Sequence, residues 1–238
     1  MSVARQALRL RWPLAAVFAV IVAAFVVMPS LAMAHDVARS DRAFVQTVSG
    51  SAFFPFLYLG AKHMVTGYDH ILFLLGVVLL LRRLKDVVLY VSMFTIGHST
   101  TLLLGVLGGI GANAHVVDAI IGLSVVYKGI DNLGGFEKIG LRPDQRLVIL
   151  VFGLFHGLGL ATKLIDLAMP RNGLVTNLVA FNIGVEAGQI LVLLPLVAFL
   201  GTVRNAPSFA IFARIASALL VVCGLAIMVQ QSMEFFAS

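Results

Sequence analysis

The chain has 238 residues, of which 60% are hydrophobic and only 12% are charged. A soluble domain is roughly 45–50% apolar and about 25% charged, so this composition excludes an ordinary soluble protein and indicates an integral membrane protein. The formal net charge is +6, but it indicates no nucleic-acid partner, because the basic residues fall in the leader and in loops. Cys223 is the single cysteine, which excludes an intrachain disulfide and a cysteine-based metal site.

Residues 1–34 have the pattern of a cleavable secretory signal peptide. Three arginines precede an apolar run at 13–28, and residues 32–34 have the small-x-small form of a cleavage site. An uncleaved first span is the alternative, because the apolar run is longer than usual. Cleavage would place His35 at the amino terminus, where its amine and ring could chelate copper or nickel. Residues 35–52 would then be a short extracytoplasmic lead-in.

Six apolar stretches follow, and each is long enough for a tilted membrane span of about 20 residues. Turn-like breaks rich in glycine, proline or charge separate them. We therefore predict an all-α, polytopic transmembrane helical bundle of six spans, forming one domain at residues 53–238. The predicted spans are 55–82, 86–108, 114–133, 146–168, 174–200 and 209–230.

Basic residues in the loops predict the orientation of these spans. Loops 82–86 and 134–146 hold three each and loop 201–208 holds Arg204, whereas the opposite loops hold only Arg171. By the positive-inside rule, the more basic loops face the cytoplasm. We therefore expect a multi-pass protein of the bacterial inner membrane, with both ends of the mature chain extracytoplasmic.

Four histidines and two carboxylates are expected in the interior of the predicted spans, away from their ends. A carboxylate at membrane depth costs roughly 2.5–3.5 kcal/mol on insertion scales, so such residues usually serve an ion or a proton. At a rise of about 1.5 Å per residue, four separate helices place a ligand-type group near the midplane. We therefore predict a site for a divalent transition metal. Its candidate ligands are His63, Asp69, His70, His98, His156 and Glu186.

Helical spacing indicates how these groups are arranged. His63 and His70 are seven residues apart and are expected to share a helix face that points into the bundle. On the fifth span, Asn182 and Gln189 lie on the same side as Glu186 and are predicted to orient it. Glycine pairs beside the polar residues predict close helix packing.

The third span carries further polar residues, which we interpret without a function. Asp118 lies near its outer end and Lys128 near its inner end, where snorkelling explains both. Ser124 is interpreted as making only an interhelical hydrogen bond. His115 lies at the boundary between this span and the preceding loop and is given no role.

Four ordered motifs resemble the HupE/UreJ family of membrane proteins, which are associated with hydrogenase and urease accessory genes. The first has the form H-x5-D-H-x-x-F at residues 63–73, and the second contains Ser99 as a supporting residue beside His98. The resemblance covers roughly residues 55–200 and implies a nickel-related role as a permease or accessory transporter. The motifs lie at residues 63–73, 94–102, 152–157 and 181–189.

Two of the motifs also resemble the nickel/cobalt permeases. In those proteins four residues separate the first histidine from the aspartate, whereas five separate His63 from Asp69 here. The extra residue rotates His63 by about 100° around the helix. Imidazole with carboxylate suits nickel, cobalt, zinc and copper, so the residues alone leave the metal open.

We expect a membrane permease or metal-binding accessory protein for a divalent transition metal, with nickel favoured by the resemblance. Its partners would be the lipid bilayer, the metal ion and intracellular metallochaperones or metalloenzyme maturation proteins. It is not expected to be an enzyme. Two alternatives remain: an intramembrane metalloenzyme with Glu186 as general base, and a haem-binding electron-transfer protein with two histidine ligands.

Overall fold

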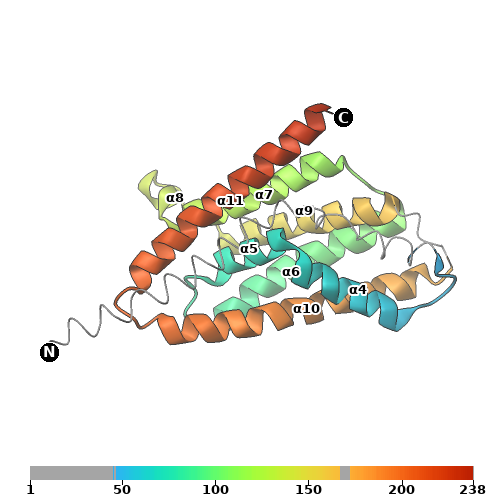
Figure 1. Ribbon diagram of the computed structural model, residues 1–238, viewed down its shortest axis with the longest axis horizontal. Coiled ribbons are helices and arrows are strands. Elements are labelled where there is room, and N and C mark those ends of the chain that lie inside the picture. Colours follow the sequence, from blue (N-terminus) through green and yellow to red (C-terminus); the bar gives the residue numbers. More distant parts are fainter. Residues whose placement is uncertain (1–44, 46, 167–171, 238) are drawn as a thin grey trace.

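The structure is a computed structural model that describes residue 45, residues 47–166 and residues 172–237. The predicted signal peptide and His35 lie outside the described residues. In the described part, all regular elements are helices and no strand occurs, which confirms the predicted all-α class. Figure 1 labels them α4 (Phe53–Thr66), α5 (Tyr68–Val78), α6 (Leu84–Gly108), α7 (Ala114–Asn132), α8 (Gly135–Lys138), α9 (Gln145–Asp166), α10 (Leu174–Val203) and α11 (Phe209–Ala237).

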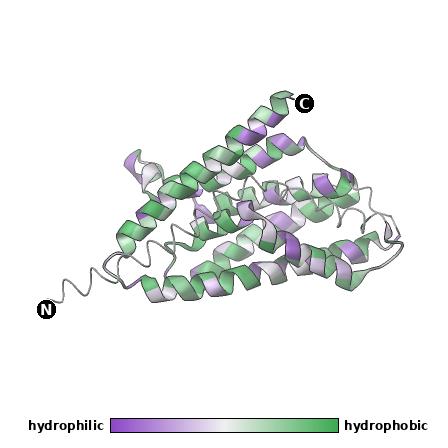
Figure 2. Cartoon of the chain, in the orientation of Figure 1, coloured by the Kyte–Doolittle hydropathy of each residue, from purple (hydrophilic) through white to green (hydrophobic). Residues whose placement is uncertain are grey.

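Four of these helices, α6, α9, α10 and α11, are long and apolar enough to cross a membrane. Hydrophobic residues run along their length in Figure 2. The first predicted span instead divides at Gly67 into α4 and α5, and neither half has span length. The third is α7, whose 19 residues include Asp118, Lys128 and Asp131. These two segments differ from the other four because one is interrupted and one is charged.

Six of the described helices pack as close pairs, α4 with α10, α6 with α9 and α7 with α11. Glycine makes each approach possible. A Cβ atom at Gly60 would collide with the backbone of α10, one at Gly157 with the backbone of α6, and one at Gly129 with the backbone of α11. The predicted role of small residues in close packing is therefore confirmed.

The short helix α5 lies at the centre of the bundle. It contacts α4, α6, α7, α10 and α11, and Figure 1 shows it between the upper and lower helices. Phe73, Leu74 and Val78 on this helix are completely buried. A side chain at the start of α5 therefore points into the interior of the bundle, where several helices can contribute neighbours.

Candidate metal centre

The chain turns at Gly67, between His63 at the end of α4 and His70 at the start of α5. Its φ of −74° and ψ of 95° interrupt the helix. The Gly67 amide still donates to the His63 carbonyl at 2.8 Å, and the Ile71 amide donates to the Gly67 carbonyl at 3.1 Å. A Cβ atom on Gly67 would lie 2.9 Å from Nδ1 of His70. Glycine is therefore required for the His70 ring to lie where it does.

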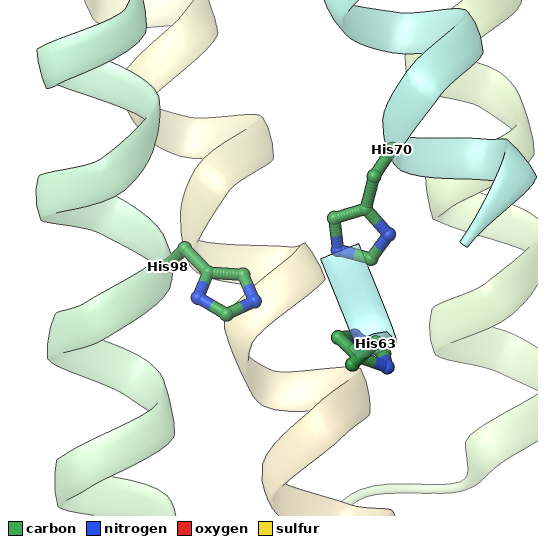
Figure 3. A group of neighbouring side chains, drawn as sticks. All are labelled: His63, His70 and His98. Atoms are coloured by element: carbon green, nitrogen blue, oxygen red, sulfur yellow. The ribbon is translucent and has the colours of Figure 1, made fainter. Parts of the chain in front are cut away.

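Four imidazole rings from four helices meet beside this turn. The ring centroid of His70 lies 5.1 Å from that of His63 on α4, 5.8 Å from that of His98 on α6 and 4.8 Å from that of His156 on α9. Figure 3 shows the rings of His63, His70 and His98 directed toward one space. His70, His98 and His156 are buried and His63 is half-buried. The prediction that His63 and His70 face inward is confirmed, but they lie on two helices and not on one shared helix face.

Two overlapping sets of three groups could each hold one metal ion, because their ligand atoms all lie within 4.8 Å of one another. One set is His63, His70 and His98. The other is Asp69, His70 and His156. The structure thus brings five of the six predicted ligands into one cluster, and His70 belongs to both sets.

Hydrogen bonds assign the protonated ring nitrogen of two histidines. Nδ1 of His70 donates to Oδ1 of Asp69 at 3.0 Å, which leaves a lone pair on Nε2. The Ser124 hydroxyl donates its proton to the Ile121 carbonyl at 2.6 Å. It therefore accepts from Nε2 of His156 at 3.2 Å, which leaves a lone pair on Nδ1 of that ring. A ring held by a second group in this way is typical of histidine metal ligands.

Five buried ring nitrogens in the cluster have no hydrogen-bond partner in the described part of the chain. Nearly all buried polar groups in folded proteins are hydrogen-bonded, so a convergent set without partners indicates a ligand site. Neutral imidazole nitrogens suit divalent nickel, cobalt, copper and zinc, and the donor set fits such an ion. The five atoms are His63 Nε2, His70 Nε2, His98 Nδ1, His98 Nε2 and His156 Nδ1.

A layer of aromatic rings covers one side of the cluster. Phe73, Phe94 and Phe152 each lie three or four residues, about one turn, from a cluster histidine on the same helix. All three lie on the same side, because α5 ends at the end of the bundle where α6 and α9 begin. The Phe73 ring centroid is 5.3 Å from that of Phe94 and 6.0 Å from that of Phe152. This aromatic layer separates the histidines from that end of the bundle.

On the opposite side, a cavity of about 10 Å³ borders the cluster, which is room for roughly one water-sized sphere. His63, His70 and His156 line it together with Asp118 of α7 and Lys163 of α9. Lys163 Nζ donates to Oδ2 of Asp118 at 3.0 Å. The Asp118 side chain is only 6% exposed, so the interpretation of this residue as snorkelling is wrong.

Lys128 also differs from the sequence interpretation, whereas Ser124 makes an interhelical hydrogen bond as interpreted. Lys128 is buried in the bundle, and its Nζ donates to Oδ2 of Asp131 at 2.6 Å and to Oε1 of Gln145 at 3.1 Å. Ser124 holds the His156 ring, as described above. The sequence did contain a signal for this burial, because the predicted span 114–133 carries three charged residues. A helix that faces lipid rarely carries so many.

Glu186 does not join the cluster. It is exposed, on the wall of a groove of about 800 Å³ between α6 and α10. Its predicted supports have other partners, because Asn182 accepts from Ser99 at 3.1 Å and Gln189 accepts from Thr95 at 2.7 Å. These bonds turn the amides toward α6, and Glu186 is rotated by roughly 40–60° from them around α10. The structure therefore corrects the placement of Glu186 among the ligands.

An all-helical, apolar bundle around a buried histidine cluster defines a membrane protein with a candidate metal centre. Residues 39–238 match the family model described as HupE / UreJ protein, and the chain belongs to this family. The match confirms the resemblance carried by the four motifs. The family is associated with nickel or cobalt transport or an accessory function. No curated protein and no solved structure matches the chain.

Proposed function

We propose that this protein is a permease that moves a divalent transition metal across the bacterial inner membrane, and that nickel is the ion. The observation that carries the proposal is that five ring nitrogens without a partner among the described residues converge at one buried place. Burying so many polar ring nitrogens without partners costs free energy, and a dication is one ligand that several imidazoles can share. The choice of nickel rests on the family.

In this proposal the chain crosses the membrane six times after a cleaved signal peptide. Helices α4 and α5 together form the first, broken span, and α7 forms the third. Interrupted spans near the midplane are a recurrent way for transporters to hold an ion. The basic loops then place the aromatic layer toward the cytoplasm and Lys163 toward the outside, with both mature termini extracytoplasmic.

The shared ligand supports a route for the ion. The ion first binds His63, His98 and His70, and then moves to the set of Asp69, His156 and His70. Because His70 belongs to both sets, the ion keeps one protein ligand while it exchanges the others. The aromatic layer must then rearrange to release the ion, and intracellular metallochaperones or maturation proteins would accept it.

The geometry gives less support to the two alternatives. The metalloenzyme alternative relied on Glu186 as general base, and that residue lies in the groove between α6 and α10. The haem alternative needs a pocket of roughly 300 Å³ or more, whereas the cavity beside the rings measures about 10 Å³.

Nickel uptake into proteoliposomes tests the proposal. We expect His70→Ala and His98→Ala to reduce uptake at least about tenfold, since each removes a ligand. His115→Ala is the matched control, because His115 lies outside both ligand sets and its ring contacts Gln231 instead. Uptake by His70→Ala at the wild-type rate and half-saturating concentration would show that the cluster does not carry the ion.

A further inference from the structure

We propose that Asp118 is an additional metal ligand at the outer mouth of the site, and that Lys163 is a tethered ammonium that occupies Asp118 until a dication displaces it. The proposal rests on the proposed function, because it assigns the last step before the ion reaches the histidines. It also gives the site a means of selecting divalent over monovalent cations.

The first support is the position of the pair. Lys163 follows His156 by seven residues on α9, which places it about 10 Å further along the same helix face. Lys163 and Asp118 line the same cavity as His63, His70 and His156. The aromatic layer covers the opposite side of the cluster, so an ion that enters through this cavity meets the pair before it meets the rings.

The second support is the pairing itself. Lys163 Nζ lies 3.3 Å from Oδ1 and 3.0 Å from Oδ2 of Asp118, so the ammonium bonds both carboxylate oxygens. The side chains are 6% exposed for Asp118 and 19% exposed for Lys163. Burying a carboxylate so far from water costs free energy that a neighbouring cation offsets. Asp118 therefore has to exchange one cation for another and cannot simply lose Lys163.

Charge decides which ions can make that exchange. At equal distance a dication attracts a carboxylate twice as strongly as an ammonium does. A monovalent ion has the same charge as the ammonium and competes against a tethered group of high effective concentration. A divalent ion can therefore displace Lys163, whereas sodium and potassium cannot. When the ion moves on to the histidines, the ammonium returns to Asp118.

Two substitutions with opposite expected signs test this exchange in proteoliposomes, with nickel chloride as the probe. Lys163→Gln removes the competing ammonium but keeps a hydrogen-bond donor, so the half-saturating nickel concentration should fall by roughly fivefold to tenfold. Asp118→Asn removes the ligand, so that concentration should rise by a similar factor. A pair with only a structural role would shift the two variants in the same direction, and that result would overturn the proposal.

A third variant keeps the ion pair intact and so avoids a folding defect. Lys163→Arg should hold Asp118 more firmly through a bidentate contact, and we expect the half-saturating concentration to rise about threefold with the maximal rate unchanged. Potassium chloride should inhibit nickel uptake by Lys163→Gln more than choline chloride of equal ionic strength does, and should not do so in the wild type. An unchanged Lys163→Arg, or equal effects of both salts on Lys163→Gln, would contradict the exchange.

His70→Ala, measured in parallel, separates the two proposals. If His70→Ala loses uptake but the Lys163 and Asp118 variants give the contradicting results described above, only the proposed cation exchange is wrong. If His70→Ala transports like the wild type, the proposed function itself is wrong.

Discussion

At the scale of the residue, the chemistry of the centre depends on which ring nitrogens are free to bind. Asp69 and Ser124 each hold one nitrogen of a neighbouring imidazole, and the other nitrogen of His70 and of His156 then has no partner in the described chain. Second groups of this kind orient metal ligands and raise their basicity. The two polar side chains thus prepare the rings for a cation before any cation is bound.

Glu186→Gln tests whether Glu186 lies outside the set of metal ligands. Glu186 lies outside both sets and lines the groove between α6 and α10. Changes at sites without shared partners usually act independently. We expect this variant to keep its nickel affinity within about twofold of the wild type in equilibrium dialysis, whereas His98→Ala measured beside it loses affinity. A loss of nickel affinity in Glu186→Gln as large as in His98→Ala would show that Glu186 is a metal ligand.

The sequence was sufficient to predict the histidines, because few other roles explain four imidazoles near one depth in three predicted spans. It was not sufficient for Glu186 or Asp118. Glu186 is the single carboxylate of α10, and Asp118 shares α7 with Lys128 and Asp131. Only the rotation of each helix decides whether the side chain meets the cluster or a groove. Rotation depends on which neighbour a helix packs against, and α10 packs mainly on α4. The sequence pattern does not show which neighbour a helix packs against.

At the scale of the element, glycine sets the distance between the helices that carry the ligands. A Cβ atom at Gly157 would collide with the carbonyl of His98, one of the ligand residues itself. Gly67 similarly allows the turn that separates His63 from His70. The break could not be predicted from the sequence, because no proline stands beside Gly67 and glycines also occur inside the unbroken helices α6, α9 and α10.

Gly157→Ala should weaken the fold, because it forces α6 and α9 apart. Overpacking of this kind costs about 1–3 kcal/mol, which corresponds to a fall of roughly 3–10 °C in the apparent Tm. Gly201→Ala is the matched control, since its Cβ atom would meet no atom within 4 Å and alanine is the better helix former. Differential scanning fluorimetry in detergent measures both. Equal Tm values for the two variants would show that the close approach at Gly157 is not required.

At the scale of the whole molecule, the bundle is different on the two sides of the metal centre. The aromatic layer closes one side, and a small polar cavity with an ion pair lies on the other. In the proposed orientation this arrangement exposes the site toward the outside and closes it toward the cytoplasm. In transport by alternating access, each conformation opens the site to one side of the membrane and closes it to the other, and this structure has that asymmetry.

Cysteine labelling tests the orientation. In a Cys223→Ala background, we expect Asn172→Cys to react with a membrane-impermeant maleimide added to spheroplasts. Asp144→Cys should react only after lysis, because its loop carries three of the basic residues. The reverse labelling pattern would invert the bundle and place the Asp118–Lys163 pair at the cytoplasmic mouth.

The most direct measurement of the central claim is X-ray absorption at the nickel edge, on purified protein loaded with one equivalent of nickel. We predict a shell of nitrogen and oxygen ligands without sulfur, including at least three imidazoles as in the set of His63, His70 and His98. In His70→Ala, which removes the ligand common to both sets, the number of imidazoles should fall. A shell of water and carboxylate oxygens alone, or the same number of imidazoles in both proteins, would contradict the proposed metal centre.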